Sequence, residues 1–494
     1  MTHSADPVLP RGRALGLAVL LVGGFAATNG VAADVSVTLG STTYVARGLA
    51  GFGRLPANLR DKFGETFGSS SGMAVAAWRR TDTGYAGALT LLPDRGYNVN
   101  GTTDYRARLN TVSVTFSPVA AGLPAALPTI SATLSDTLLL TDASGNPLSG
   151  LDPSATRAAS AGLPELPEAA NGRVSFDAEA MARAPDGTLF ISDEYGPYIY
   201  RFTAGGKMTG AIRPPDALIP IRKGVANFSA NSPGPGGKAP DPANPETGRQ
   251  NNQGLEGLSL SPSGRTLIAL LQSATRQDGG DAAPTRRHTR ALVYDVSDTA
   301  SPRLVAEHVV PLPTFIDAKG SQLVAAQSEI VALSETAFLM LARDSGNGYG
   351  TPGDTSSFRK ILLVDVSGAT NIAGSAFDTV KPIAPKGLLD PSITAAKVHE
   401  FIDLNDAAEL ARFGLHNGAP NDRNNLSEKW ESMGLASALD PQQPDDFFLF
   451  VGNDNDFITQ DGFQVGASYR DASGADVDTM LLAFRVTLPG VAGK

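Results

Sequence analysis

The chain of 494 residues carries 40 basic and 50 acidic side chains, a formal net charge of −10, and no cysteine. This acidic balance, without a basic cluster, argues against nucleic acid or an anionic membrane as a partner. The lack of cysteine excludes disulfides and a lipoprotein anchor. The 53 glycines and 34 prolines exceed average usage but stay below the level typical of disorder, so the composition favours a β-rich fold with many turns.

Residues 1–33 are predicted to form a signal peptide. Arg11 and Arg13 precede an apolar run, residues 14–25, that is too short to span a membrane comfortably. Val31-Ala32-Ala33 then offers small residues for cleavage, with a membrane anchor as the alternative interpretation. We therefore expect residues 34–494 to form a single domain of a bacterial periplasmic or secreted protein, which relies on its core because it has no disulfides.

The first strand signals lie between residues 72 and 116. Residues 72–78 and 85–92 are strand-like, and the second run ends in the polar turn Pro93-Asp94-Arg95-Gly96. Residues 109–116 are predicted to form the outer strand that follows. Arg95 therefore stands at the polar end of a predicted strand.

The clearest unit begins at Glu179. The turn Pro185-Asp186-Gly187 is followed by a short apolar strand, residues 188–192, and then by two carboxylates, Asp193 and Glu194. After a Gly-Pro break, residues 199–202 are predicted to form a second strand. The order is thus a glutamate, a turn, a buried strand and a polar strand end.

The same order returns three more times along the chain. Each later unit has a glutamate, an apolar run and a polar end, at these positions: Glu256, residues 266–271 and Gln272; Glu329, residues 337–342 and Arg343-Asp344; Glu431, residues 445–451 and Asn453-Asp454-Asn455-Asp456. A supersecondary unit that repeats with a carboxylate in the same place is typical of a β-propeller, which builds its site on the axis.

Two long insertions interrupt the repeat. Residues 213–253 are rich in proline and glycine and should overhang the face that carries the carboxylates, as a substrate rim or as a passive insertion. Residues 382–425 are predicted to cap another edge, with helical spacing in residues 406–413. The fold class predicted is all-β, a β-propeller of six blades, with five or seven as alternatives.

Carboxylates at equivalent positions of successive blades should converge on the axis, where they either raise one another's pKa values or share a cation. Hard oxygen ligands without cysteine favour Ca²⁺ over zinc. The first candidate ligands are the four repeated glutamates, and the second set lies at the strand ends: Glu179, Glu256, Glu329, Glu431; Asp193, Glu194, Asp344, Asp454 and Asp456.

Two arginines are the remaining candidates. Arg95 and Arg343 occupy matching strand ends, where each could clamp a phosphate or carboxylate of a substrate or pair with the acidic cluster. If the site is catalytic, Glu179 or Glu256 would act as the general base.

Several phrases of the chain resemble a known family, the phytase-like proteins described as "esterase-like activity of phytase". They are Asp177-Ala178-Glu179-Ala180-Met181, Ser192-Asp193-Glu194-Tyr195-Gly196-Pro197, Asn252-Gln253-Gly254-Leu255-Glu256 and Gly452-Asn453-Asp454-Asn455-Asp456. The resemblance covers nearly all of the chain after the predicted signal peptide. It implies an exported propeller and a Ca²⁺-dependent ester or phosphoester hydrolase.

The leading expectation is a monomeric hydrolase with a small-molecule ester or phosphoester substrate and no nucleic-acid or membrane partner. A Ca²⁺-dependent lactonase of the gluconolactonase type is a second enzyme reading. A non-catalytic propeller with structural calcium, whose loop-rich face binds a ligand or protein, is the alternative from a different class.

Overall fold

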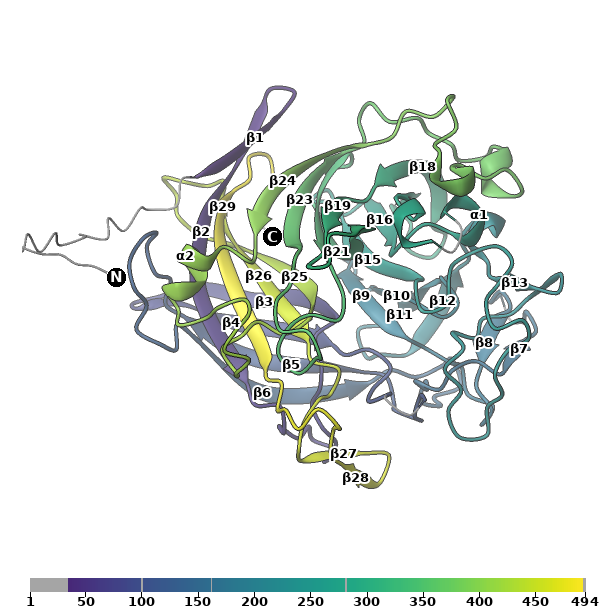
Figure 1. Ribbon diagram of the computed structural model, residues 1–494, viewed down its shortest axis with the longest axis horizontal. Coiled ribbons are helices and arrows are strands. Elements are labelled where there is room, and N and C mark those ends of the chain that lie inside the picture. Colours follow the sequence, from purple (N-terminus) through teal and green to yellow (C-terminus); the bar gives the residue numbers. More distant parts are fainter. Residues whose placement is uncertain (1–33, 99–100, 161, 280–281, 492–494) are drawn as a thin grey trace, which may run out of the picture. The chain divides into compact units, whose positions relative to one another are not determined.

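The computed structural model describes residues 34–98, 101–160, 162–279 and 282–491 of the chain, so the predicted signal peptide lies outside the described residues. These residues form five antiparallel blades (Figure 1). Blade 1 consists of β3 (Gly72–Thr81), β4 (Gly84–Leu92), β5 (Arg108–Phe116) and β6 (Ile130–Leu139). Blade 2 consists of β9 (Ala178–Arg183), β10 (Leu189–Asp193), β11 (Ile199–Phe202) and β12 (Met208–Ile212).

The next two blades have the same order of strands. Blade 3 consists of β15 (Leu255–Leu260), β16 (Thr266–Leu271), β17 (His288–Asp295) and β18 (Arg303–Pro311). Blade 4 consists of β21 (Ala326–Ala332), β22 (Ala337–Arg343), β23 (Arg359–Asp365) and β24 (Lys397–Asp403). In blades 1 to 4 the first strand is innermost and neighbouring strands follow one another in the sequence.

Blade 5 joins the two ends of the described chain. It takes β25 (Lys429–Ser437), β26 (Asp446–Asp454) and β29 (Thr479–Thr487) from the end, and β2 (Thr42–Leu55) and β1 (Val35–Leu39) from the beginning. The purple strand β2 pairs with the yellow strand β29 in Figure 1. The inner strands β3, β9, β15, β21 and β25 contact one another in turn, and β25 contacts β3, so the ring is closed.

The core lies between the blades in five apolar clusters, one at each interface between neighbouring blades. Strand β16 illustrates why its sequence is apolar throughout. Leu267, Ala269 and Leu271 face blade 2, whereas Ile268 and Leu270 face blade 4. Because side chains alternate along a strand, both faces of each blade are buried against a neighbour.

The propeller class is confirmed, and the number of blades is five, the alternative to the preferred count of six. The long intervals between the repeated glutamates contain connections and the two-stranded hairpins β13–β14 (Ile221–Arg222, Val225–Ala226) and β19–β20 (Thr314–Ile316, Gln322–Val324) rather than a sixth blade. Two further hairpins lie outside these intervals: β7–β8 (Ala155–Arg157, Leu166–Glu168) precedes Glu179, and β27–β28 (Gly462–Gln464, Ala467–Tyr469) follows Glu431.

The two predicted insertions have ordered interiors. In residues 213–253, the buried Arg249 donates hydrogen bonds to the backbone carbonyls of Tyr195 and Phe228, which fixes the loop against blade 2. The expected helical turn in residues 406–413 is α2 (Ala407–Ala411), capped by Asp406, but residues 397–403 of that insertion are the outer strand of blade 4. The described residues also contain α1 (Arg276–Gly279) and four 3₁₀ turns. No helix in this part of the chain is long and apolar enough to cross a bilayer.

Candidate active site

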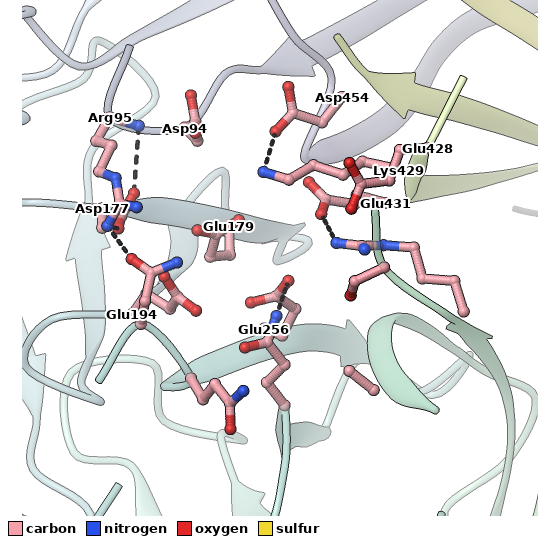
Figure 2. A pocket seen from close by; sticks show the side chains of 16 residues that line it. Asp94, Arg95, Asp177, Glu179, Glu194, Glu256, Glu428, Lys429, Glu431 and Asp454 are labelled. Carbon is pink, nitrogen blue, oxygen red and sulfur yellow. Dashed lines mark hydrogen bonds and ion pairs between the residues drawn. The ribbon is translucent and has the colours of Figure 1, made fainter. Parts of the chain in front are cut away.

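A polar cavity of about 190 Å³, called the central cavity below, opens where the inner strands begin. In an antiparallel pair the start of the first strand lies beside the end of the second, so residues from both places line the cavity. Figure 2 shows its 16 lining residues. They are Asp94, Arg95, Asp177, Glu179, Glu194, Asn252, Gln253, Glu256, Gln272, Ala326, Arg343, Ser345, Glu428, Lys429, Glu431 and Asp454. Eight carboxylates face three cations, a formal excess of five negative charges.

Three glutamates from three blades meet in the cavity. One carboxylate oxygen of each of Glu179, Glu256 and Glu431 lies within 4.8 Å of the others, and all three residues are buried (Figure 2). Glu256 and Glu431 are each the extra residue of a β-bulge, between Leu255 and Gly257 and between Trp430 and Ser432. The bulge turns the carboxylate out of the blade toward the axis.

Glu179 also belongs to a second group, with Asp177 and Glu194, whose oxygens lie within the same distance. Glu179 is therefore common to two clusters that could each hold a cation. A third group, Asp94, Asp454 and Asp456, already contains a cation, because Lys429 Nζ lies 3.2 Å from Asp454 and 2.7 Å from Asp456.

Burial and mutual repulsion favour protonated carboxyls in the cavity. Burial, and then the charge of Glu256, raises the pKa of Glu179 well above its usual value. Burial, and then Glu194 and Glu431, does the same to the pKa of Glu256. Burial and Asp177 raise the pKa of Glu194 to about 8. Such shifts mark a place where a cation would be stabilised.

Two fully buried carboxylate oxygens of the cavity have no hydrogen-bond partner in the described part of the chain. Gln272 Nε2 donates to Glu256 Oε1 over 2.8 Å, whereas Glu256 Oε2 is buried and unpartnered. Glu194 Oε1 is also buried without a partner. Buried polar atoms are normally paired, so these two oxygens point to a ligand that completes them.

The three cations hold the walls of the cavity. Arg95 donates to Asp177 Oδ2 over 2.7 Å and to Asn252, and Arg343 forms a buried ion pair with Glu431. Burial lowers the pKa of Lys429, but Asp456 and the other nearby carboxylates outweigh it and raise that pKa well above its usual value. Both predicted arginines thus lie in the cavity and pair within the protein.

Most of the candidate residues from the sequence come together, and three do not. Seven of the candidates line the cavity: Glu179, Glu194, Glu256, Glu431, Asp454, Arg95 and Arg343. Asp456 does not line it but forms an ion pair with Lys429, which does. Asp193 accepts the backbone amides of Asp177 and Gly196, and Asp344 accepts from Ser356 Oγ and the amide of Ser357, so both carboxylates stabilise turns.

Glu329 lies apart from the other three glutamates. The bulge of β21 falls on Ser328 instead, so the repeat is offset by one residue in blade 4. The carboxylate accepts the amides of Ile330 (2.8 Å) and Leu258 (3.2 Å) and lines a separate, largely apolar cavity. The sequence gives no sign of this offset, because a bulge depends on strand pairing.

Several lining residues were not among the sequence candidates. They are Asp94, Asp177, Asn252, Gln253, Gln272, Ser345, Glu428 and Lys429. Two of them could have been found by their place in the sequence, two residues before a repeated glutamate: Asp177 precedes Glu179, and Lys429 precedes Glu431.

Comparison with known proteins agrees with the resemblance found in the sequence. A protein of Arthroderma benhamiae named "Uncharacterized secreted protein" is 39% identical over 458 residues, which cover 86% of this chain and 89% of that protein. Among solved structures, the Malassezia sympodialis allergen Mala s 1 has 10% identity and a TM-score of 0.31, with 91% of this chain and 88% of that chain covered. A luciferin-regenerating enzyme has 12% identity and a TM-score of 0.24, with 87% and 95% covered. Residues 65–457 match the family model "Phytase-like: Esterase-like activity of phytase", and the chain therefore belongs to the phytase-like family.

Proposed function

We propose that the protein is an exported, Ca²⁺-dependent hydrolase that cleaves ester or phosphoester bonds in the central cavity. The observation that carries this proposal is the convergence of Glu179, Glu256 and Glu431, whose oxygens lie within 4.8 Å of one another in a buried place. Several carboxylates this close are ionised together only when a cation neutralises them. Membership of the phytase-like family supports ester bonds as the target.

The donor set fits a hard cation. The described lining of the cavity offers carboxylate and amide oxygens and no histidine, and the chain has no cysteine. Calcium takes six to eight such oxygen ligands in flexible geometry. Glu179, Glu256 and Glu431 would hold the ion, with Asp177 and Glu194 on the other side of Glu179. When bound, Ca²⁺ would neutralise the substrate oxygens and polarise the bond to be cleaved.

The protein's own residues would supply the base and the orientation. Gln272 holds Glu256 Oε1 and leaves Oε2 able to take a proton from a water molecule. The water oxygen would form a bond to phosphorus or to the carbonyl carbon, and the bond to the alcohol oxygen would break. That oxygen would leave as an alcohol after accepting the proton that Glu256 had taken from the water. Arg95 and Arg343 keep Asp177 and Glu431 in place by ion pairing.

The expected surroundings of the protein follow from the same argument. Export is supported by the similar Arthroderma benhamiae protein, which is named a secreted protein. The partner would be a small-molecule ester, with no nucleic acid and no membrane, because the chain is acidic and the cavity is negative. We expect a monomer, since the five blades already close into a ring.

The test is hydrolysis of a panel of phosphomonoesters, phosphodiesters, carboxylic esters and lactones by the full chain, with Ca²⁺ and with a chelator. We expect cleavage of a phosphoester or carboxylic ester that is lost in chelator and restored by Ca²⁺. Cleavage of lactones alone would establish a lactonase instead. Undiminished cleavage in chelator would contradict the metal dependence, and no cleavage of any substrate would favour a non-catalytic binding protein.

A further inference from the structure

A second cavity, called the annex below, adjoins the central cavity. It has a volume of about 420 Å³, and its walls share Gln253, Ala326, Arg343 and Ser345 with the central cavity. The hairpin β19–β20, which connects blades 3 and 4, forms its outer wall. A molecule that reaches the carboxylates can therefore extend into the annex past Arg343.

The central cavity is too small to hold a whole organic substrate. Cavities that bind small molecules measure roughly 300–1,000 Å³, whereas the central cavity measures about 190 Å³. It has room for a compact polar group such as a phosphoryl or carboxyl group. The remainder of any larger substrate needs the neighbouring space.

The annex differs from the central cavity in its chemistry. Phe315, Leu323 and Val324 of the hairpin give it an apolar wall. Phe315 and Leu323 are opposite each other across the two strands, and the ring of Phe315 stacks on that of Phe358 with centroids 5.7 Å apart. This wall is thus fixed by packing on blade 4, which suits it to hold an apolar group in one position.

The charge of the annex is close to balanced. Apart from Arg343, which is paired with Glu431, its lining contains two cations, Arg286 and Lys319, and two carboxylates, Asp317 and Asp344. Both carboxylates accept hydrogen bonds from their own loops. The annex therefore lacks the negative excess of the central cavity.

We propose that the annex binds the apolar side of the substrate, so that the substrates are esters of an alkyl or aryl group rather than esters of a highly charged polyol. This inference rests on the proposed function, since it assumes that the reacting group lies among the carboxylates. The reacting end is held in the central cavity, and the apolar group lies against Phe315 and Leu323. The shared chemistry is an anionic or ester head on an apolar chain, from either a phosphorus acid or a carboxylic acid.

Binding of non-hydrolysable probes tests the annex without hydrolysis. The Ca²⁺-loaded full chain is titrated calorimetrically with methylphosphonate and hexylphosphonate, and with acetate and hexanoate, so that the two kinds of head are distinguished. Each buried methylene strengthens binding by about fourfold, and we expect the longer member of one pair to bind at least about tenfold more tightly. Equal affinity within both pairs would overturn the proposal.

Variants of the hairpin locate the effect. Leu323→Trp should fill the annex and abolish the preference for the long chain while leaving the affinity for the short probe unchanged. Leu323→Ser removes apolar surface from the wall of the annex without filling the cavity, and it should weaken the preference for the long-chain probe. Ile316→Trp is the matched control, because Ile316 is on the same hairpin, is 60% exposed and does not line the annex. A preference for the long chain that survives both Leu323 variants would overturn the proposal.

The annex and the hydrolase can fail separately. If the long probes bind more tightly but no ester is cleaved, the proposal for the annex is supported and the proposed hydrolase activity is contradicted. If methyl and hexyl esters are both cleaved with the same kcat/KM, the hydrolase stands and the annex proposal fails.

Discussion

Gln272 Nε2 donates a hydrogen bond to Glu256 Oε1 over 2.8 Å, at the point where strands β15 and β16 of blade 3 meet the central cavity. The bond fixes one oxygen of the carboxylate and leaves Oε2 buried and unpartnered in the described part of the protein. Since the strand end at Gln272 and the bulge at Glu256 belong to one antiparallel pair, the orientation of the carboxylate is built into the blade.

Glu256→Gln should abolish most of the activity while leaving the propeller folded. The amide keeps the shape of the side chain but cannot accept a proton from water or carry the charge that a cation needs. Loss of a general base lowers the rate by about 10²–10⁴-fold. The rate is measured as kcat on the best substrate of the panel, and the fold is checked by the melting temperature in the absence of Ca²⁺.

Glu329→Gln is the matched control for this variant. Glu329 is a buried glutamate of the neighbouring inner strand, but it accepts two backbone amides away from the cluster. Burial raises its pKa well above the usual value, so the amide resembles the protonated side chain. Activity and the response to Ca²⁺ should both persist, and loss of either would return Glu329 to the set of ligands.

The fold class and the convergence of Glu179, Glu256 and Glu431 could be predicted from the sequence, because both depend on local repetition. A glutamate, a turn, an apolar run and a polar strand end can each be recognised within about twenty residues. The blade count and the position of Glu329 depend on pairing between distant residues. Strand β2, for instance, completes the blade that also contains β29, and the bulge on Ser328 rather than on Glu329 is set by the pairing of β21 with β22.

Calcium should raise the melting temperature of the metal-free protein. A ligand that binds the folded state alone stabilises it by about 2.7 kcal/mol at a hundredfold excess over Kd, which corresponds to several degrees for a domain of moderate size. Mg²⁺ should have less effect, because it tolerates crowded protein ligands poorly. Calorimetric scans after treatment with chelator, with each ion added back, measure the difference. An unchanged melting temperature in protein shown to be metal-free would contradict a calcium site.

The metal-free protein should lose stability as the pH rises from about 4.5 to about 8. Burial and Asp177 raise the pKa of Glu194 to about 8, and burial raises the pKa of Asp193 to about 7. In this pH range the folded state therefore holds protons that the unfolded chain has already released. These protons contribute fully to the free energy of unfolding at pH values below the pKa values of the unfolded chain. The contribution is lost as the pH rises through the pKa values of the folded state. Bound Ca²⁺ should flatten the profile by replacing the protons of the cluster. Melting temperatures across this pH range, with and without Ca²⁺, test both statements, and a metal-free profile that rises with pH would contradict them.

Arg343→Ala should destabilise the fold far more than an arginine change on the surface. Arg343 and Glu431 come from neighbouring blades, and their side chains are 5% and 4% exposed. Removing the arginine leaves Glu431 without its cation, and breaking a buried pair in this way costs about 3–5 kcal/mol.

Arg303→Ala is the control, because Arg303 is 74% exposed in its pair with Asp295 and its removal should have little effect on the melting temperature. Since Glu431 belongs to the group with Glu179 and Glu256, added Ca²⁺ should restore part of the stability lost in Arg343→Ala. Chemical unfolding of both variants with and without Ca²⁺ measures this, and a loss equal to that of Arg303→Ala would show that the buried pair contributes no more than a surface one.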